Sequence, residues 1–155
     1  MSGMAAHSEL LERFLNYWKG LKMGDTYSDG RLNSHSDRIY FMIQCSVKSD
    51  PDEFQKWARD RASKYVFDLK EEKSVSYEWH LSDDNTEATL VESFVDSDGA
   101  MQRLSNHAAS PLAAEVLELV DIKDVLCLGN AKQDLIDTLT AWGAKFQRQF
   151  CGYHK

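Results

Sequence analysis

The sequence predicts an α+β protein built around one core, and three observations support this prediction. The chain has 155 residues, about the length of one domain. Hydrophobic residues make up 43% of the chain and charged residues 28%, which is typical of a soluble globular protein. Segments with the twofold alternation of a strand are interleaved with segments that have the spacing of an amphipathic helix. We therefore expect one sheet with helices packed against it.

The first 37 residues predict a helix followed by a long linker. Between residues 8 and 22, apolar residues recur at helical spacing: Leu11, Phe14, Leu15, Trp18 and Leu21. Residues 24–37 are rich in Gly, Ser, Asp and Asn and have little periodicity, which is typical of a connection. We therefore expect two parts of the chain, with residues 1–37 as the N-terminal helix and linker and residues 38–155 as a single α+β domain with a C-terminal extension.

The first half of this domain predicts one strand and one long helix. Residues 38–47 alternate so that one strand face carries Ile39, Phe41, Ile43, Cys45 and Val47. Asp50 precedes Pro51 and an acidic first turn, which is the arrangement of a helix N-terminus. Apolar residues then recur at helical spacing as far as Leu69. We expect a helix of roughly four turns there.

The second half predicts a hairpin, a helical region and a last strand. Residues 75–81 and 88–95 alternate on either side of a polar turn. Helices are predicted over 96–107 and from Ser110, and residues 122–128 form the next strand. The order β-α-β-β-α-β is that of a ferredoxin-like fold, whose antiparallel sheet has both helices on one face. Apolar positions then predict a short C-terminal helix that ends at Gly143.

Composition and motifs exclude several classes of function. No segment approaches the ~18 apolar residues of a membrane span, and the N-terminus does not resemble a secretory leader, so we expect a cytoplasmic protein without a membrane partner. The net charge is −7 with dispersed Lys and Arg, which disfavours nucleic acid. Cys151 and His154 alone fall short of a zinc site, so we expect no metal. Nucleotide-binding and hydrolase motifs are absent from the sequence.

Three stretches carry a resemblance to a known family. They are YEWHLSDD in the second predicted strand, LVESFVDSDGA in the third strand and the turn after it, and the tail DLIDTLTAWGAKFQRQFCGYHK. Over residues 38–155 the chain resembles the antibiotic-biosynthesis-monooxygenase-like family of the dimeric α+β barrel superfamily. Its tail is similar to a C-terminal extension of a subset of bacterial members. Such motifs specify a fold better than an activity, because one fold hosts many functions.

The resemblance implies a homodimer and an oxidative function. Characterised members of the family oxidise phenolic or quinol-like aromatics with O₂ and use neither metal nor flavin, which implies no cofactor here. A haem-degrading branch has an Asn, a Trp and a His at places that look like Gln44, Phe94 and His107. Because Phe94 lacks an indole N–H, haem degradation is disfavoured. Other members have an H-x-x-S-x-H pattern, of which this chain keeps His107 and Ser110 but has Leu112 at the second His.

Two histidines are the candidate catalytic residues. His107 follows Asn106 near a predicted helix end, where a neutral imidazole could accept a phenolic proton. His80 shares a strand face with Glu78, which could orient it. The alternative interpretations are a partly exposed helix-end His and a solvated strand face.

Aromatic and polar strand residues are the candidate binding residues for a flat aromatic ligand. They are Tyr40, Gln44, Tyr77, Trp79 and Phe94. Together with His107 they are expected to line a pocket between the sheet and the second helix, and the alternative is ordinary core packing. Arg103 is expected to be a surface residue whose stem covers apolar neighbours, and Glu71 and Glu72 are expected to be solvated.

Two functional hypotheses follow. The first is a cofactor-independent monooxygenase of quinol-like or polyphenolic aromatics, which would deprotonate its substrate in a dry pocket. The second is a non-catalytic dimeric barrel that binds a small apolar ligand or a protein partner. Leu112 and the N-terminal helix favour the second hypothesis, and the aromatic strand faces leave the first open.

Overall fold

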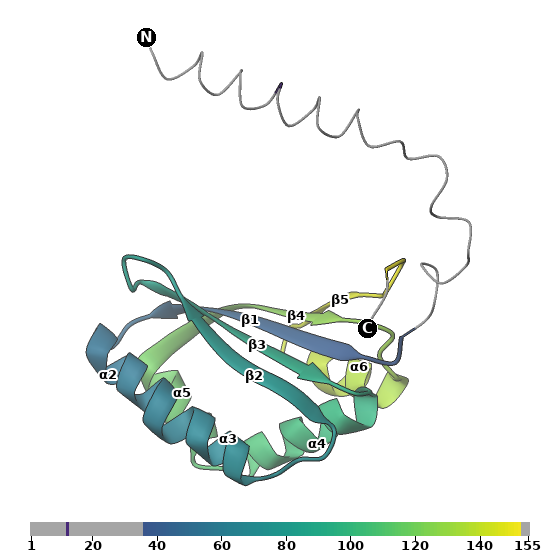
Figure 1. Ribbon diagram of the computed structural model, residues 1–155, viewed down its shortest axis with the longest axis horizontal. Helices are drawn as coiled ribbons and strands as arrows, with labels where there is room; N and C mark the ends of the chain where they lie inside the picture. The colour runs from purple at the N-terminus through teal and green to yellow at the C-terminus, as the bar shows by residue number, and fades with distance from the viewer. Residues whose placement is uncertain (1–11, 13–35, 153–155) are drawn as a thin grey trace. The chain divides into compact units, whose positions relative to one another are not determined.

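A five-stranded sheet with the strand order β2-β3-β1-β4-β5 forms the centre of the fold (Figure 1). Its four long strands are antiparallel: β1 (Ile39–Val47), β2 (Ser74–Leu81), β3 (Glu87–Phe94) and β4 (Val120–Leu128). The predicted ferredoxin-like α+β fold is therefore confirmed. A short β5 (Lys145–Gln147), which the sequence analysis did not predict, pairs in parallel with β4 and makes the sheet mixed.

The computed structural model describes residue 12 and residues 36–152. The described domain belongs to one unit that spans His35–Phe150. The N-terminal helix expected between residues 8 and 22 lies outside the described residues apart from Glu12, as does nearly all of the expected linker. No helix in the described part is both long and apolar enough to span a membrane.

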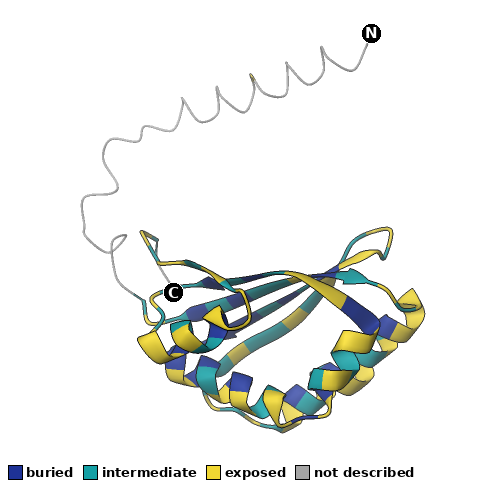
Figure 2. Ribbon diagram, turned by 180° about the vertical axis from the view of Figure 1, so that it is seen from behind, coloured by how far each residue is buried: buried dark blue, intermediate teal, exposed yellow. Residues whose placement is uncertain are grey.

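The helices lie on one face of the sheet, as predicted (Figures 1 and 2). The first continuous helix consists of α2 (Pro51–Lys56), η1 (Trp57–Ser63) and α3 (Lys64–Asp68). Three further helices follow it: α4 (Ser97–Ala108), α5 (Leu112–Leu119) and α6 (Gln133–Thr140). Asp50 caps α2 by accepting from the backbone N–H groups of Asp52 and Glu53, and Asp96 caps α4 by accepting from that of Gly99. These caps agree with the helix starts predicted from the sequence.

The middle of the first helix differs from the sequence prediction. Residues Trp57–Ser63 form a π-helix, in which the chain takes more residues per turn than in an α-helix. Ser63 Oγ donates to the carbonyl oxygen of Ala58 at 2.6 Å, five residues earlier. This side-chain bond competes with the regular backbone ladder, which amphipathic periodicity cannot reveal.

The core lies between the sheet and the helices. Ile39, Phe41 and Cys45 are buried on the face of β1 that meets the helices, as the alternation predicted. Phe41 packs against Phe94 with ring centroids 5.0 Å apart, and α6 adds Leu135 and Leu139 to the same cluster. The C-terminal helix is therefore part of the domain core.

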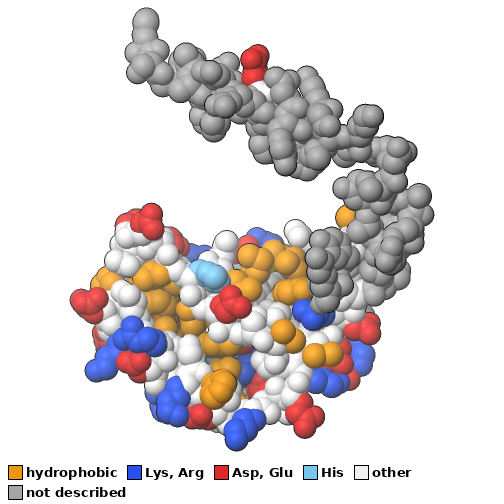
Figure 3. Space-filling view, viewed as in Figure 1, with side chains coloured by type: hydrophobic (Ala, Val, Ile, Leu, Met, Phe, Trp, Pro, Cys, Tyr) orange, Lys and Arg blue, Asp and Glu red, His pale blue; other side chains and the backbone are white. Residues whose placement is uncertain are grey.

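The opposite face of the sheet carries an apolar centre with a polar margin. Met42 of β1 stands beside Val91 of β3 and Leu126 of β4, and all three are half-buried. Glu78 and His80 of β2 are exposed on the same face because they alternate with Tyr77 and Trp79. In the view of Figure 3, exposed hydrophobic side chains lie among charges of both signs.

We expect this sheet face to be covered by a second copy of the chain. Half-buried apolar side chains at its centre would otherwise face water, and a stable interface of this kind buries more than ~2,000 Å² in total. Sedimentation velocity of the full chain at micromolar concentration should give one species of dimer mass. A single species of monomer mass would contradict this prediction.

Candidate active site

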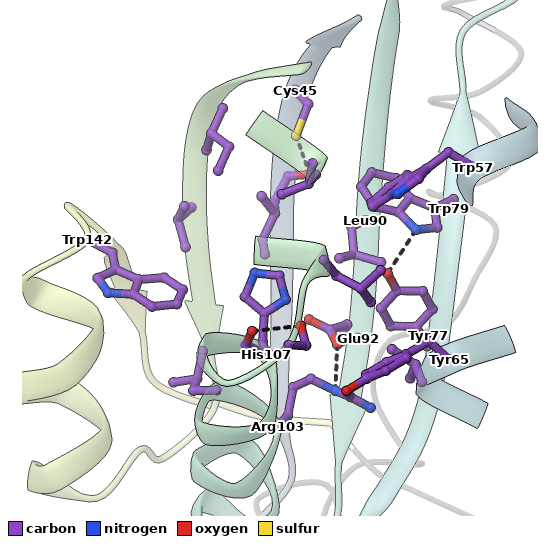
Figure 4. A pocket seen from close by; sticks show the side chains of 18 residues that line it. Cys45, Trp57, Tyr65, Tyr77, Trp79, Leu90, Glu92, Arg103, His107 and Trp142 are labelled. Carbon is purple, nitrogen blue, oxygen red and sulfur yellow. Dashed lines mark hydrogen bonds and ion pairs between the residues drawn. The ribbon is translucent and has the colours of Figure 1, made fainter. Parts of the chain in front are cut away.

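A cavity lies between the sheet and the helices, with walls from all four long strands and from η1, α3, α4 and α5. Most of its lining is aliphatic or aromatic, and Figure 4 shows these side chains around a common space. The cavity volume is about 90 Å³. A cavity of about 150 Å³ holds benzene, so this smaller one takes a single ring at most, and only if its walls move outward. Ile122 and Trp142 also line it and are about half exposed, so they mark where it meets solvent.

The structure brings together three of the candidate residues. Tyr77, Trp79 and His107 line the cavity, and Figure 4 shows the His107 imidazole directed into it. His107 lies in the last turn of α4, and its carbonyl oxygen accepts from both the backbone N–H and the hydroxyl of Ser110. Leu112 is buried in the wall, at the place where the resemblance would put a second His.

The other four candidates lie elsewhere. Tyr40 and Gln44 alternate with Phe41 and Cys45, so they belong to the sheet face opposite the cavity. Phe94 is completely buried in the core against Phe41. His80 is exposed on the far face, with its Nε2 3.6 Å from Glu78 Oε2. The expected pocket therefore contains only part of the predicted set. Strand alternation separates Tyr40, Gln44 and His80 from the cavity, whereas Phe94 shares its strand face with Glu92 but lies further along β3, in the core.

One wall of the cavity is a set of interlocked aromatic rings. The rings of Trp79 and Tyr77 meet edge to face at 6.4 Å, and those of Trp57 and Trp79 at 6.2 Å. Trp79 Nε1 donates to the Tyr77 hydroxyl at 3.1 Å, and Trp57 Nε1 donates to Glu115 Oε2 at 2.8 Å. Glu115 is held in turn by Arg61 at 2.8 Å. These bonds fix the ring orientations, and Trp57 is a wall residue that the sequence analysis missed.

A buried charged triad borders the same cavity. Arg103 Nη2 lies 2.6 Å from Glu71 Oε2, and Arg103 Nε lies 3.2 Å from Glu92 Oε1. All three side chains are at most 6% exposed. The expectations of a surface Arg103 and a solvated Glu71 are therefore wrong. Asn106 Nδ2 donates to Glu71 Oε1 at 2.6 Å, and the Arg103 guanidinium lies 5.8 Å from the centre of the Tyr77 ring.

The sequence does contain a signal for this triad. Glu92 alternates with Ala88, Leu90 and Phe94 on the core face of β3, and Arg103 occupies an apolar position of α4. A charge at an apolar position of each of two neighbouring elements indicates a buried pair, since an isolated buried charge is too costly. The position of Glu71 carries no such signal, because it precedes β2 in a connection.

Burial sets the protonation of the cavity groups. It raises the pKa of Glu92 to about 7, with Glu71 adding to the rise and Arg103 opposing it. Burial lowers the pKa of His107, and the positive charge of Arg103 lowers it further. The pKa of Tyr77 is raised mainly by burial. At neutral pH, His107 is therefore a neutral proton acceptor, and Glu92 exchanges its proton near pH 7.

Solved structures share this fold. MupZ from Pseudomonas fluorescens is similar to this chain with a TM-score of 0.63 and 16% identity, over 79% of this chain and 92% of MupZ. SnoaB, a cofactor-independent oxygenase from Streptomyces nogalater, is similar with a TM-score of 0.52 and 18% identity, over 63% of this chain and 96% of SnoaB. No family model and no curated protein matches the sequence. The likeness to these structures confirms the expected ferredoxin-like α+β fold.

Proposed function

We propose that the cavity binds a small quinol-like or polyphenolic aromatic and that the protein oxidises it with O₂ without a cofactor. The observation that carries this proposal is a neutral His107 imidazole inside an aromatic, mostly apolar cavity. The likeness in fold to SnoaB, a cofactor-independent oxygenase, supports the same class of reaction.

In this proposal His107 begins the reaction by removing a proton from a substrate hydroxyl. The resulting electron-rich anion supplies the electrons that reduce O₂. One oxygen atom enters a ring carbon as a carbonyl and the other leaves as water. The two hydrogens of that water are the single hydrogen of the oxidised ring carbon and the hydroxyl proton that His107 removed. Tyr77, Trp79 and Trp57 hold the ring by their faces and edges. The apolar walls keep water from protonating the anion before O₂ reacts.

A second candidate function is binding without catalysis. Leu112 stands in the wall where the second histidine of the resembling pattern would be, so His107 is the one histidine among the described residues that line the cavity. A non-catalytic domain of this kind would take a small apolar ligand into the same space or use the open sheet face for a protein partner. The aromatic walls suit both functions, and an activity measurement separates them.

Oxygen uptake by the purified full-length protein tests the enzyme proposal. An oxygen electrode with 1,4-hydroquinone, catechol and pyrogallol should show protein-dependent uptake above autoxidation for at least one compound, and uptake should persist after treatment with EDTA. Heat-denatured protein is the control. If none of these compounds is consumed although they bind, the enzyme proposal is rejected and the binding function is retained.

A further inference from the structure

The charged triad gives the cavity a chemical preference that its aromatic walls alone would not have. With both carboxylates ionised, Glu71, Arg103 and Glu92 carry a net charge of −1 in a place nearly free of solvent. Glu71 is engaged by Arg103 and by Asn106. Glu92 lies on the other side of Arg103 and lines the cavity itself, where Figure 4 shows it next to His107.

The charge of Arg103 is already compensated by two carboxylates. Its Nη2 lies 2.6 Å from Glu71 Oε2 and its Nε 3.2 Å from Glu92 Oε1, although neither nitrogen makes a well-aligned hydrogen bond with the described residues. The Tyr77 ring lies 5.8 Å from the guanidinium. Above pH 7, where Glu92 is mostly ionised, a carboxylate that entered the cavity would meet a triad with a net negative charge in a low-dielectric space, where repulsion is strong. A neutral hydroxyl would instead meet a carboxylate, which accepts a short and strong hydrogen bond.

We propose that the Glu92 carboxylate accepts a hydrogen bond from a hydroxyl of the ligand. The cavity would then select neutral, hydroxylated single rings over aromatic carboxylates and plain hydrocarbons of the same size. This inference uses the cavity of the proposed function and specifies its substrate class. The ring faces Tyr77 and Trp79, and a second hydroxyl, where present, is left for His107. The limit of one ring follows from the volume of about 90 Å³.

Anaerobic binding to the full chain tests this inference, with Trp57 and Trp79 of the wall as fluorescent reporters. The probes are phenol, toluene, which has the same shape without a hydroxyl, and benzoate, which carries a charge. Phenol should bind at least about tenfold more tightly than toluene, because a buried polar group left unpaired penalises the analogue that lacks the hydroxyl. At pH 8.5, where Glu92 is ionised, benzoate should not bind at concentrations that saturate the protein with phenol.

Two variants of Glu92 separate its charge from its hydrogen-bonding capacity. Glu92→Met removes the acceptor but keeps the Arg103–Glu71 ion pair, so toluene should bind at least as tightly as phenol. Glu92→Gln keeps an acceptor oxygen and removes the charge, so benzoate should begin to bind. Glu87→Gln, an exposed position of the same strand, is the matched control and should leave all three affinities unchanged.

The inference is overturned if wild-type protein binds toluene as tightly as phenol, if none of the three probes binds, or if Glu92→Met keeps the preference for phenol. The wild-type comparison decides even if a variant fails to fold. Because binding is measured without O₂, a phenol preference without oxygen uptake would reject the enzyme and keep the role of Glu92. Oxygen uptake without a preference for phenol would keep the enzyme proposal and reject the role of Glu92.

Discussion

Replacing Arg103 with methionine should lower the free energy of unfolding by about 3–5 kcal/mol at neutral pH. The side chain is almost completely buried between Glu71 and Glu92, and its removal leaves two carboxylates without their counter-charge. Methionine keeps most of the packing volume, so the loss reports charge rather than a cavity. Urea denaturation monitored by circular dichroism at pH 7.5 measures this change in the free energy of unfolding.

The loss should become smaller at pH 5.5. Burial raises the pKa of Glu92 from 4.5 in the unfolded chain to about 7 in the folded protein, so the folded state holds this proton more tightly. The resulting stabilisation is fully present below pH 4.5 and is lost as the pH rises through 7. In the Arg103→Met variant, acidification therefore neutralises Glu92, one of the two carboxylates left without a counter-charge. Arg59→Met, at an exposed residue that pairs with Asp60, is the control and should change stability by less than about 0.5 kcal/mol. Equal stability of Arg103→Met and the control would refute the buried triad.

Replacing His107 with alanine should lower the oxidation rate of the best quinol substrate by about 10²- to 10⁴-fold, the usual range for one general base. Wild-type activity should rise with pH through a value below 6.5 and level off near neutrality. The sign follows because burial and Arg103 both favour the neutral imidazole, which is the form that accepts a proton.

Two further variants assign this pH profile. Burial raises the pKa of Glu92 to about 7 in the same cavity. Glu92→Gln should therefore remove any inflection of the activity profile near pH 7 and leave the rise at lower pH, which we assign to His107. His80→Ala, on the opposite sheet face, should keep full activity. An active His107→Ala variant together with an inactive His80→Ala variant would move the role of base to His80.

Local signals predicted most of the fold. Asp50 with Pro51 and Asp96 mark helix starts through bonds to residues two or three positions away, which a sequence displays directly. The alternation of β1 likewise predicted its buried face. The short β5 was missed because three residues carry too little periodicity, and its pairing depends on β4, which is far away in the sequence.

The candidate site was harder to predict because it depends on tertiary distances. His107, Tyr77 and Trp79 were found from their residue types, and the structure places them in one cavity. Tyr40 and Gln44 were attractive for the same reason, although the alternation of β1 already placed them on the face opposite Phe41 and Cys45. The triad joins Glu71 in a connection to a strand and a helix, so its members become partners only when the chain is folded.

The π-helical segment sets where the first helix can change length without changing the cavity wall. Phe54 and Trp57 precede or begin this segment and pack near Trp79, whereas Ala62 near its end and Val66 beyond it belong to a second buried cluster. A π-turn holds about one residue more than an α-turn, so the loss of one residue between Trp57 and Ser63 would return the helix to α-geometry while its two halves keep nearly their present orientation. The loss of one residue from an α-helical part would instead turn one half by roughly 100° relative to the other. A homologue one residue shorter in the π-helical segment should therefore keep the same cavity wall.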